Sequence, residues 1–252
     1  MTLHLIGIGL AEEKDISVKG LEAVKKSEII YLENYTSLLQ CTQEDLEKFY
    51  GKKITLLSRK ACEEDVEKII TEAQIKEVAF LIIGDPFSAT THIELFRSAK
   101  EKNIPIHIIH NASVLTAIGE TGLQLYNFGK ITSIPFPEKV PNLETPYIVL
   151  QQNLSLGMHT LFLLDLDPEK NKFLTIPEAI QTLEDIESRK KENFITPKTF
   201  AVACARLGSR TALIKAGTLL ELKKIDFGKP PYCLIIPGKL HFLEEEMLRL
   251  YQ

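Results

Sequence analysis

Residues 78–92 read Val-Ala-Phe-Leu-Ile-Ile-Gly-Asp-Pro-Phe-Ser-Ala-Thr-Thr-His. The first six of these residues are apolar without a break, which predicts a strand buried on both faces, as in a parallel sheet. Gly84 frees the backbone where the strand ends, and Asp85 with the following proline favours a turn. Thr91 and Glu94 then form a capping box that predicts the start of a helix. A carboxylate, hydroxyls and helix amides therefore gather where open α/β sheets bind ligands.

The sequence around this stretch alternates between strand and helix patterns. Helices are expected from Ser17 or Asp15, over 63–73 and over 92–102, where Asn103 can end the helix in a left-handed conformation. The alternation predicts a parallel sheet with right-handed crossovers and an N-terminal α/β domain over 1–110. Residues 3–10 are expected to form a first strand that runs into a glycine-containing loop, and the other expected strands are 29–32, 54–57, 78–83 and 106–109.

The second half, 111–252, has a different pattern and is expected to form a second α/β domain with a mixed sheet. Thr175 and Glu178 form a capping box with a proline in the first turn, which predicts a helix with a buried apolar stripe. A last amphipathic helix is expected to carry Leu243, Met247 and Leu250. The prolines predict an exposed loop at Pro135, Pro137, Pro141 and Pro146. The expected strands are 160–164, 200–205, 212–216 and 232–236.

Composition excludes several classes of function. The 252 residues include 30 basic and 34 acidic side chains, a formal net charge of −4, which favours neither a nucleic-acid partner nor an anionic membrane surface. No apolar run approaches the ~18 residues that a membrane span needs. The four cysteines are widely spaced, and two of them lie inside apolar runs, where they resemble small buried hydrophobes. This use of cysteine indicates a reducing compartment and so a cytoplasmic protein. They are Cys41, Cys62, Cys204 and Cys233.

Gly7 and Gly9 begin like a dinucleotide fingerprint, and Glu33 after the second strand could bind a ribose, so a nicotinamide oxidoreductase is one alternative. Glu12, however, stands where the third glycine belongs, which argues against that pyrophosphate geometry. Two glycines that only make a tight turn fit the local sequence equally well.

Metal and covalent chemistry have no support in the motifs. His107 and His110 lie three apart, so on one strand they point to opposite faces, and we expect no metal site. There is no G-x-S-x-G elbow and no P-loop lysine motif.

Asp85 is either a turn residue or a ligand contact. What remains is a candidate cofactor crevice without a metal, a nucleophile or a phosphate cradle. Such a crevice suits methyl transfer from a sulfonium donor, which requires chiefly in-line placement of donor and acceptor.

A set of segments, in order over both halves of the chain, is similar to one known family. The segments are Leu5–Leu10, Asp15–Leu21, Tyr31–Ser37, Gly84–His92, Ile109–Val114, Gly122–Gly129, Gly157–Asp165, Ala205–Gly208 and Pro237–Phe242. They resemble the diphthine synthase family, the methyltransferases of diphthamide biosynthesis, within the tetrapyrrole-methylase-like class.

The resemblance implies two α/β domains with S-adenosylmethionine in the cleft between them, S-adenosylhomocysteine as product, and a homodimer. It implies a protein acceptor, the histidine of translation elongation factor 2 that carries a 3-amino-3-carboxypropyl group, which would be methylated repeatedly. Some family members stop at the trimethylated amine and others also form a methyl ester, and the sequence leaves both outcomes open. A small-molecule tetrapyrrole methylase and a binding module without turnover are alternatives; the segments at 122–129 and 237–242 argue against the former.

The resemblance also implies which residues contact the cofactor. Asp85 would bind its ribose or its ammonium group, and at Tyr232 the family often has histidine, so a backbone contact is expected to survive there. No residue is identified as a general base, and the catalytic residues are unassigned. The implied cofactor contacts are Leu10, Asp85, Ser88, Ser113, Val114, Leu164, Leu207 and Tyr232.

Overall fold

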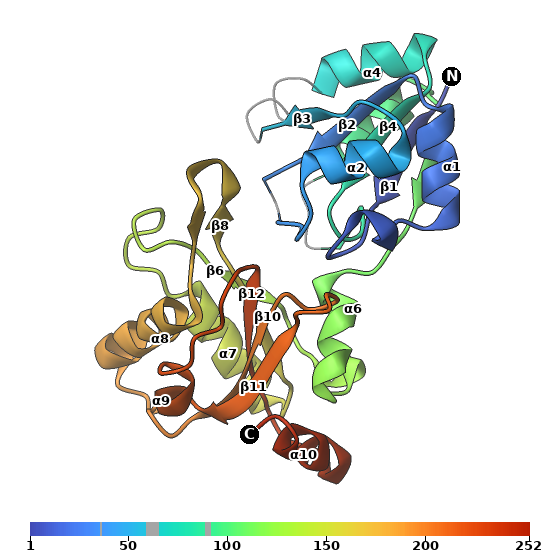
Figure 1. Ribbon diagram of the computed structural model, residues 1–252. Coiled ribbons are helices and arrows are strands. Elements are labelled where there is room, and N and C mark those ends of the chain that lie inside the picture. The colour runs from blue at the N-terminus through green and yellow to red at the C-terminus, as the bar shows by residue number, and fades with distance from the viewer. Residues whose placement is uncertain (36, 59–65, 89–91) are drawn as a thin grey trace. The chain divides into compact units, whose positions relative to one another are not determined.

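A computed structural model describes residues 1–35, 37–58, 66–88 and 92–252, which form two compact units, Met1–Ala117 and Ile118–Gln252 (Figure 1). Each unit is built on its own five-stranded sheet. The α/β class and the two kinds of sheet are confirmed, one parallel and one mixed. The division expected from sequence, 1–110 and 111–252, stays a prediction about domains.

Unit 1 holds a parallel sheet in the order β3-β2-β4-β1-β5. The strands are β1 (Leu3–Gly7), β2 (Ile29–Glu33), β3 (Thr55–Leu57), β4 (Val78–Ile82) and β5 (Ile106–Ile109). The helices are η1 (Glu13–Asp15), α1 (Val18–Lys26), α2 (Gln43–Tyr50), α4 (Val66–Ile75), α5 (Ile93–Glu101) and α6 (Val114–Ala117).

The central strand β4 is buried on both faces, as its unbroken apolar run predicted. Phe80 and Ile82 pack into one core cluster with residues of α4 and α5. Ala79 and Leu81 pack into a second cluster with residues of α1 and α2. Helices therefore cover both sheet faces, and the strand ends remain as the place where side chains can meet a ligand.

Most element boundaries in unit 1 agree with the expectation. Ser17 caps α1, since its side chain accepts from the Gly20 N–H, and Asn103 has a left-handed φ of 54°. Helix α5 has His92 at its N-cap without a side-chain cap bond. The predicted capping pair of Thr91 and Glu94 falls partly outside the described residues, because Thr91 is not among them.

Unit 2 holds a mixed sheet in the order β11-β10-β12-β7-β6, in which only the β6–β7 pair is parallel among the described strands. The strands are β6 (Thr132–Ile134), β7 (Thr160–Leu164), β8 (Leu166–Asp167), β9 (Lys172–Phe173), β10 (Phe200–Ala205), β11 (Leu213–Thr218) and β12 (Tyr232–Ile236). The helices are η2 (Ile118–Thr121), η3 (Leu125–Asn127), α7 (Thr145–Ser155), η4 (Pro168–Lys170), α8 (Ile176–Lys190), α9 (Leu219–Leu222) and α10 (Phe242–Arg249).

Helix α8 begins and packs as its sequence predicted. The Thr175 side chain accepts from the Glu178 N–H, and the Glu178 carboxylate accepts in return from the Thr175 N–H at 2.8 Å. Residues of α7, α8 and α9 form one core cluster with one face of the sheet. The predicted buried stripe of α8 is confirmed at Ile176, Ala179, Ile180, Leu183 and Ile186.

One expectation for unit 2 is wrong. The proline-rich stretch does not form only an exposed loop, because β6 and the first turn of α7 lie at its ends and Pro146 and Tyr147 are buried. Proline is compatible with the first turn of a helix, where its missing N–H has no intrahelical partner anyway. The expected last helix is α10, in which Glu244 and Leu248 are buried and Leu243, Met247 and the following Leu250 are exposed.

Candidate functional site

The loops that follow β1 and β4 are joined at the carboxyl edge of the unit 1 sheet. The Gly84 N–H donates to the Gly9 carbonyl oxygen at 2.7 Å, and the Gly9 N–H donates back to Gly84 at 3.4 Å. Gly84 has a φ of 87°, and a Cβ on Gly7 would lie 2.5 Å from the Gly84 carbonyl oxygen. Gly84 must be glycine because its backbone is left-handed, and Gly7 must be glycine because a side chain there would prevent the close approach of the two backbones.

The Asp85 carboxylate organises the turn after β4. Its Oδ1 accepts from the Phe87 N–H at 3.0 Å and from the Ser88 hydroxyl at 3.1 Å. Its Oδ2 lies 2.7 Å from His110 Nδ1 and accepts from the Asn111 N–H at 3.2 Å. Burial alone would raise the pKa of Asp85, but these hydrogen bonds outweigh burial and lower it. Asp85 is therefore an ionised carboxylate that ties the β4 loop to the β5 loop.

Asn111 makes a second cross-link at the same edge, and sequence reasoning missed this role. Its Nδ2 donates to the Gly7 carbonyl oxygen at 3.0 Å and to the Asp15 carbonyl oxygen at 2.9 Å. Its own N–H donates to Asp85. The one signal available was its place directly behind a predicted strand, where polar side chains of a parallel sheet converge. Asn111 thus holds the ends of β1 and β5 together.

Glu33 and Glu12, the two acidic residues that bear on the nicotinamide alternative, form hydrogen bonds with backbone N–H groups. Glu33 is fully buried; its Oε1 accepts from the Ile83 N–H at 3.2 Å and its Oε2 from the Tyr35 N–H at 3.4 Å. Glu12 belongs to a capping box with Asp15, whose carboxylate accepts from the Glu12 N–H at 3.2 Å. These contacts give both residues a role in loop structure.

The structure places the implied cofactor contacts in two groups, one in each unit. Five follow strands at the carboxyl edge of the unit 1 sheet: Leu10 after β1, Asp85 and Ser88 after β4, and Ser113 and Val114 after β5. Of these, Asp85 and Ser113 are buried.

The other three lie at one edge of the unit 2 sheet. Leu164 ends β7, Leu207 follows β10 and Tyr232 begins β12, and the antiparallel register brings these strand ends together. Leu164 and Leu207 are buried, and the Tyr232 hydroxyl donates to the Gly228 carbonyl oxygen. Apolar side chains, hydroxyls and backbone amides of this kind can hold a ligand with an apolar ring and polar substituents.

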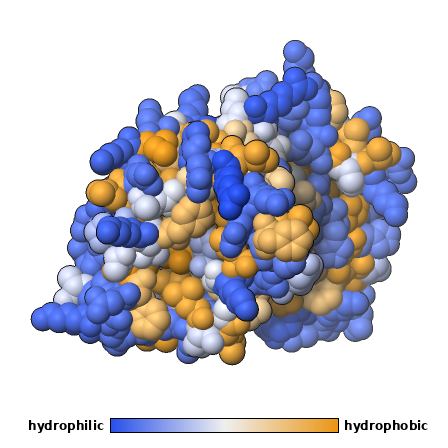
Figure 2. All heavy atoms as spheres, turned by 90° about the horizontal axis from the view of Figure 1, so that it is seen from below, coloured by the Kyte–Doolittle hydropathy of each residue, from blue (hydrophilic) through white to orange (hydrophobic). Residues whose placement is uncertain are grey.

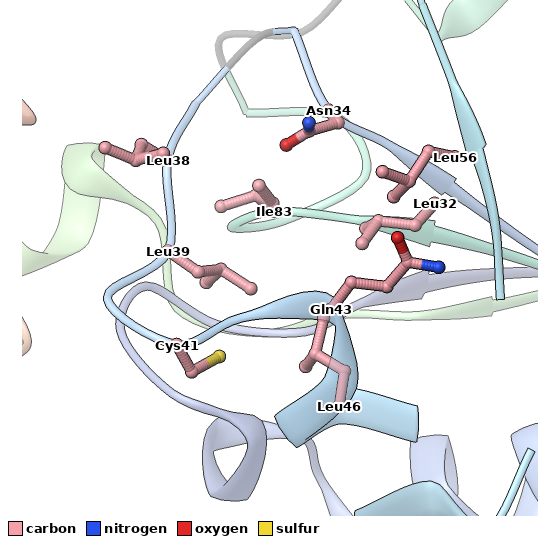
Figure 3. A pocket seen from close by; sticks show the side chains of 9 residues that line it. All are labelled: Leu32, Asn34, Leu38, Leu39, Cys41, Gln43, Leu46, Leu56 and Ile83. Atoms are coloured by element: carbon pink, nitrogen blue, oxygen red, sulfur yellow. The ribbon is translucent and has the colours of Figure 1, made fainter. Parts of the chain in front are cut away.

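Unit 1 also contains a pocket of about 210 Å³ beside the Asp85 loop (Figure 3). Most of its lining is apolar. Cys41 and the amides of Asn34 and Gln43 complete it, and burial raises the pKa of the Cys41 thiol to about 11. The apolar lining residues are Leu32, Leu38, Leu39, Leu46, Leu56 and Ile83.

The described residues contain neither a membrane-spanning helix nor a metal-binding cluster. None of the helices within 1–35, 37–58, 66–88 and 92–252 is long and apolar enough to span a membrane. Across the same ranges, no group of three or more His, Cys, Asp or Glu side chains is arranged to hold a metal ion.

The chain is similar to known proteins in sequence and in structure over nearly its full length. The family profile described as Tetrapyrrole (Corrin/Porphyrin) Methylases matches residues 2–223. The diphthine synthase of Methanocaldococcus jannaschii is 48% identical, covering 98% of this chain and 97% of that protein. An Arabidopsis thaliana protein named "Probable diphthine methyl ester synthase" is 42% identical, covering 99% and 98%. A crystal structure of diphthine synthase superposes with a TM-score of 0.91 at 39% identity, covering 100% of this chain and 96% of that one.

Proposed function

The chain belongs to the tetrapyrrole methylase family and is a methyltransferase of the diphthine synthase type, and on that premise we propose its donor and its acceptor. The donor is S-adenosylmethionine. The acceptor is the histidine of translation elongation factor 2 that carries a 3-amino-3-carboxypropyl group, and its amine is methylated repeatedly in the cytoplasm. The single observation that carries this proposal is the similarity to diphthine synthases over 98% of the chain.

We assign cofactor binding to the residues that follow the strand ends. Leu10 and Val114 in unit 1, and separately Leu164 and Leu207 in unit 2, offer apolar side chains and backbone groups of the kind that contact adenine. The four hydrogen bonds that Asp85 accepts inside the protein favour a role in shaping the loop, with Ser88 and the loop amides facing the cofactor.

Methyl transfer to an amine requires little from the protein beyond placement. Bound S-adenosylmethionine would supply an activated methyl group to the neutral amine and would leave as S-adenosylhomocysteine. The first two transfers would each release one proton to solvent, whereas the third gives a quaternary ammonium that carries no proton. The strand-end loops contribute by fixing the donor, since oriented reactants remove much of the entropic barrier.

A mass measurement tests this function. Purified elongation factor 2 bearing the intermediate is incubated with the protein and S-adenosylmethionine, and its intact mass is recorded. Added methyl groups are expected, and their number decides between the trimethylated amine and a further methyl ester. An unchanged acceptor mass would refute the proposal. Unchanged mass together with calorimetric binding of S-adenosylhomocysteine would identify a binding module without turnover.

The two remaining alternatives have separate readouts. A small-molecule tetrapyrrole methylase is disfavoured because the relatives that match the whole chain are named for diphthine. Methylation of a tetrapyrrole but not of the elongation factor would reverse that judgement. The nicotinamide oxidoreductase is disfavoured because Glu33 and Glu12 bind backbone groups. Calorimetry against NADH is expected to show no heat of binding.

We also propose that the protein is a homodimer that uses the exposed face of α10. Helix α10 lies at the lower end of unit 2 in Figure 1, and the view from below shows apolar side chains among polar ones (Figure 2). Sedimentation analysis is expected to give a dimer that Leu243→Asp dissociates, with Leu156→Asp as an exposed control. An unchanged dimer in Leu243→Asp would exclude this face. Its exposed side chains are Phe242 (62%), Leu243 (49%), Met247 (38%) and Leu250 (73%).

A further inference from the structure

The pocket of Figure 3 lies next to the proposed cofactor loop within unit 1. Ile83 lines the pocket and is followed directly by Gly84 and Asp85. Leu32, on the neighbouring strand β2, also lines it. A group bound here would therefore lie beside the loop to which we assign cofactor contacts, at the carboxyl edge where ligands of open sheets bind.

The size of the pocket suits one amino-acid side chain. Its volume is about 210 Å³, whereas pockets for drug-sized ligands are roughly 300–1,000 Å³. A molecule as large as S-adenosylmethionine does not fit into this space.

The lining selects an uncharged group. None of the described side chains that line the pocket carries a charge, and Cys41 remains a thiol at neutral pH because of its raised pKa. Burying an unpaired charge in such a place costs far more than burying an apolar group. The described lining therefore offers no charged partner to a sulfonium or to the aminocarboxypropyl group of the acceptor.

The side-chain amides of Asn34 and Gln43 add neutral polar groups to the pocket lining. Gln43 is fixed because its Nε2 donates to the Ile54 carbonyl oxygen at 2.8 Å and to Glu47 at 3.1 Å, which leaves its Oε1 without a donor in the described part of the chain. The Asn34 side chain makes no hydrogen bond to any described residue and lies across the pocket from Leu46 (Figure 3). Main-chain groups of a bound peptide can pair with such amides.

Two leucines of the pocket wall retain exposed surface. Leu56 is 42% exposed and Leu38 is half-buried. Covering apolar surface gains about 25 cal/mol per Å², so an inserted apolar side chain would be retained here.

We propose that this pocket binds an uncharged apolar side chain of the acceptor protein, from the polypeptide that flanks the methylated residue. The inference rests on the proposed function and extends it from the methylated group to the recognition of the surrounding protein. Asn34 and Gln43 bind the main chain of that segment, and Leu32, Leu39 and Ile83 surround its side chain.

Kinetics of wild type, Leu38→Asp and Leu56→Asp with purified modified elongation factor test the pocket. Each variant puts a carboxylate at a wall position that retains exposed surface. The acceptor KM is expected to rise about tenfold or more, which corresponds to about 1.4 kcal/mol of binding. The Kd for S-adenosylhomocysteine by calorimetry is expected to stay within about twofold. Leu220→Asp is the matched control, a 51% exposed leucine in unit 2.

Leu38→Ala, checked by thermal melting, replaces the aspartate variants if they fail to fold, and it should raise the acceptor KM by a smaller factor. An unchanged acceptor KM in all variants would overturn the pocket while the methyltransferase function stands. A weaker affinity for S-adenosylhomocysteine with an unchanged acceptor KM would assign the pocket to the cofactor and overturn it as well. Absence of methylation by wild type would remove the function and this inference together.

Discussion

His159 Nε2 lies 3.1 Å from Glu244 Oε1, and neither side chain has any exposed surface. The Gly238 N–H donates to His159 Nδ1 at 3.0 Å, so Nδ1 is the acceptor and the Nε2–H donates to the carboxylate. Glu244 also accepts from the N–H groups of Gln124 at 2.8 Å and His241 at 2.7 Å. Burial would raise the pKa of Glu244, but these hydrogen bonds outweigh it and lower the pKa. One buried carboxylate thus joins α10 to segments more than 80 residues away.

Replacement of this carboxylate is expected to destabilise unit 2. Both carboxylate oxygens of Glu244 accept hydrogen bonds, one from His159 and Gln124 and the other from His241. In Glu244→Gln one of these oxygens becomes an NH2 group, so in either orientation of the amide a donor faces a donor. We expect a loss of about 3 kcal/mol in the free energy of unfolding, measured by chemical denaturation. Glu245→Gln, one position along on the exposed face of α10, is the matched control and should change stability by less than about 0.5 kcal/mol. Equal midpoints for the two variants would contradict this account.

Asp85→Ala is expected to weaken cofactor binding more than it lowers stability. The variant loses four hydrogen bonds that set the path of the β4 loop, so the loop no longer holds its binding conformation. We expect the affinity for S-adenosylhomocysteine to fall by about a hundredfold by calorimetry. Ser88→Ala removes one of these bonds and should have a smaller effect. A large drop in melting temperature with unchanged affinity would show that Asp85 only maintains the turn.

Gly7→Ala is expected to separate the loops at the carboxyl edge of unit 1. The added Cβ would lie 2.5 Å from the Gly84 carbonyl oxygen, and both groups are held by backbone. Such overpacking costs about 1–3 kcal/mol of unfolding free energy and should lower S-adenosylhomocysteine affinity too. Gly119→Ala is the control, because its Cβ would meet Leu125 at an ordinary 3.8 Å. A Gly7→Ala protein that matches wild type in both measurements would refute the close approach.

His92 is expected to make the protein sensitive to acid. Burial lowers its pKa from 6.5 to about 4, and its ring packs against Phe80 with centroids 5.4 Å apart. Above pH 6.5 the ring is neutral in both states and adds nothing. As the pH falls from 6.5 toward 4, only the unfolded state binds the proton, so wild type should lose about 3 kcal/mol relative to His92→Leu. Unfolding free energies measured at several pH values should diverge in this window; parallel curves would contradict the burial of a neutral ring.

Local signals in the sequence were enough for most of the fold. The unbroken apolar run of β4 predicted a strand buried on both faces, and Thr175 with Glu178 predicted the start of α8. These signals work because burial and capping depend on residues within a few positions of one another. The same holds for the left-handed end of α5 at Asn103.

The features that sequence reasoning missed depend on distant parts of the chain. Periodicity gave α10 an apolar stripe, but the face that packs is decided by Glu244, whose partners include Gln124 and His159. Asn111 becomes a cross-link only when the ends of β1 and β5 lie side by side. The assignment of cofactor contacts stays a prediction, since it came from resemblance and not from local pattern.

The bonds of Asp85 and Asn111 have a consequence for how unit 1 receives a ligand. They hold the loops after β1, β4 and β5 together within the protein itself. The conformational entropy of these loops is therefore lost when the chain folds rather than when a ligand arrives. A molecule that binds at this edge meets a surface already in shape, and its affinity reflects the contacts it makes instead of the ordering it must impose.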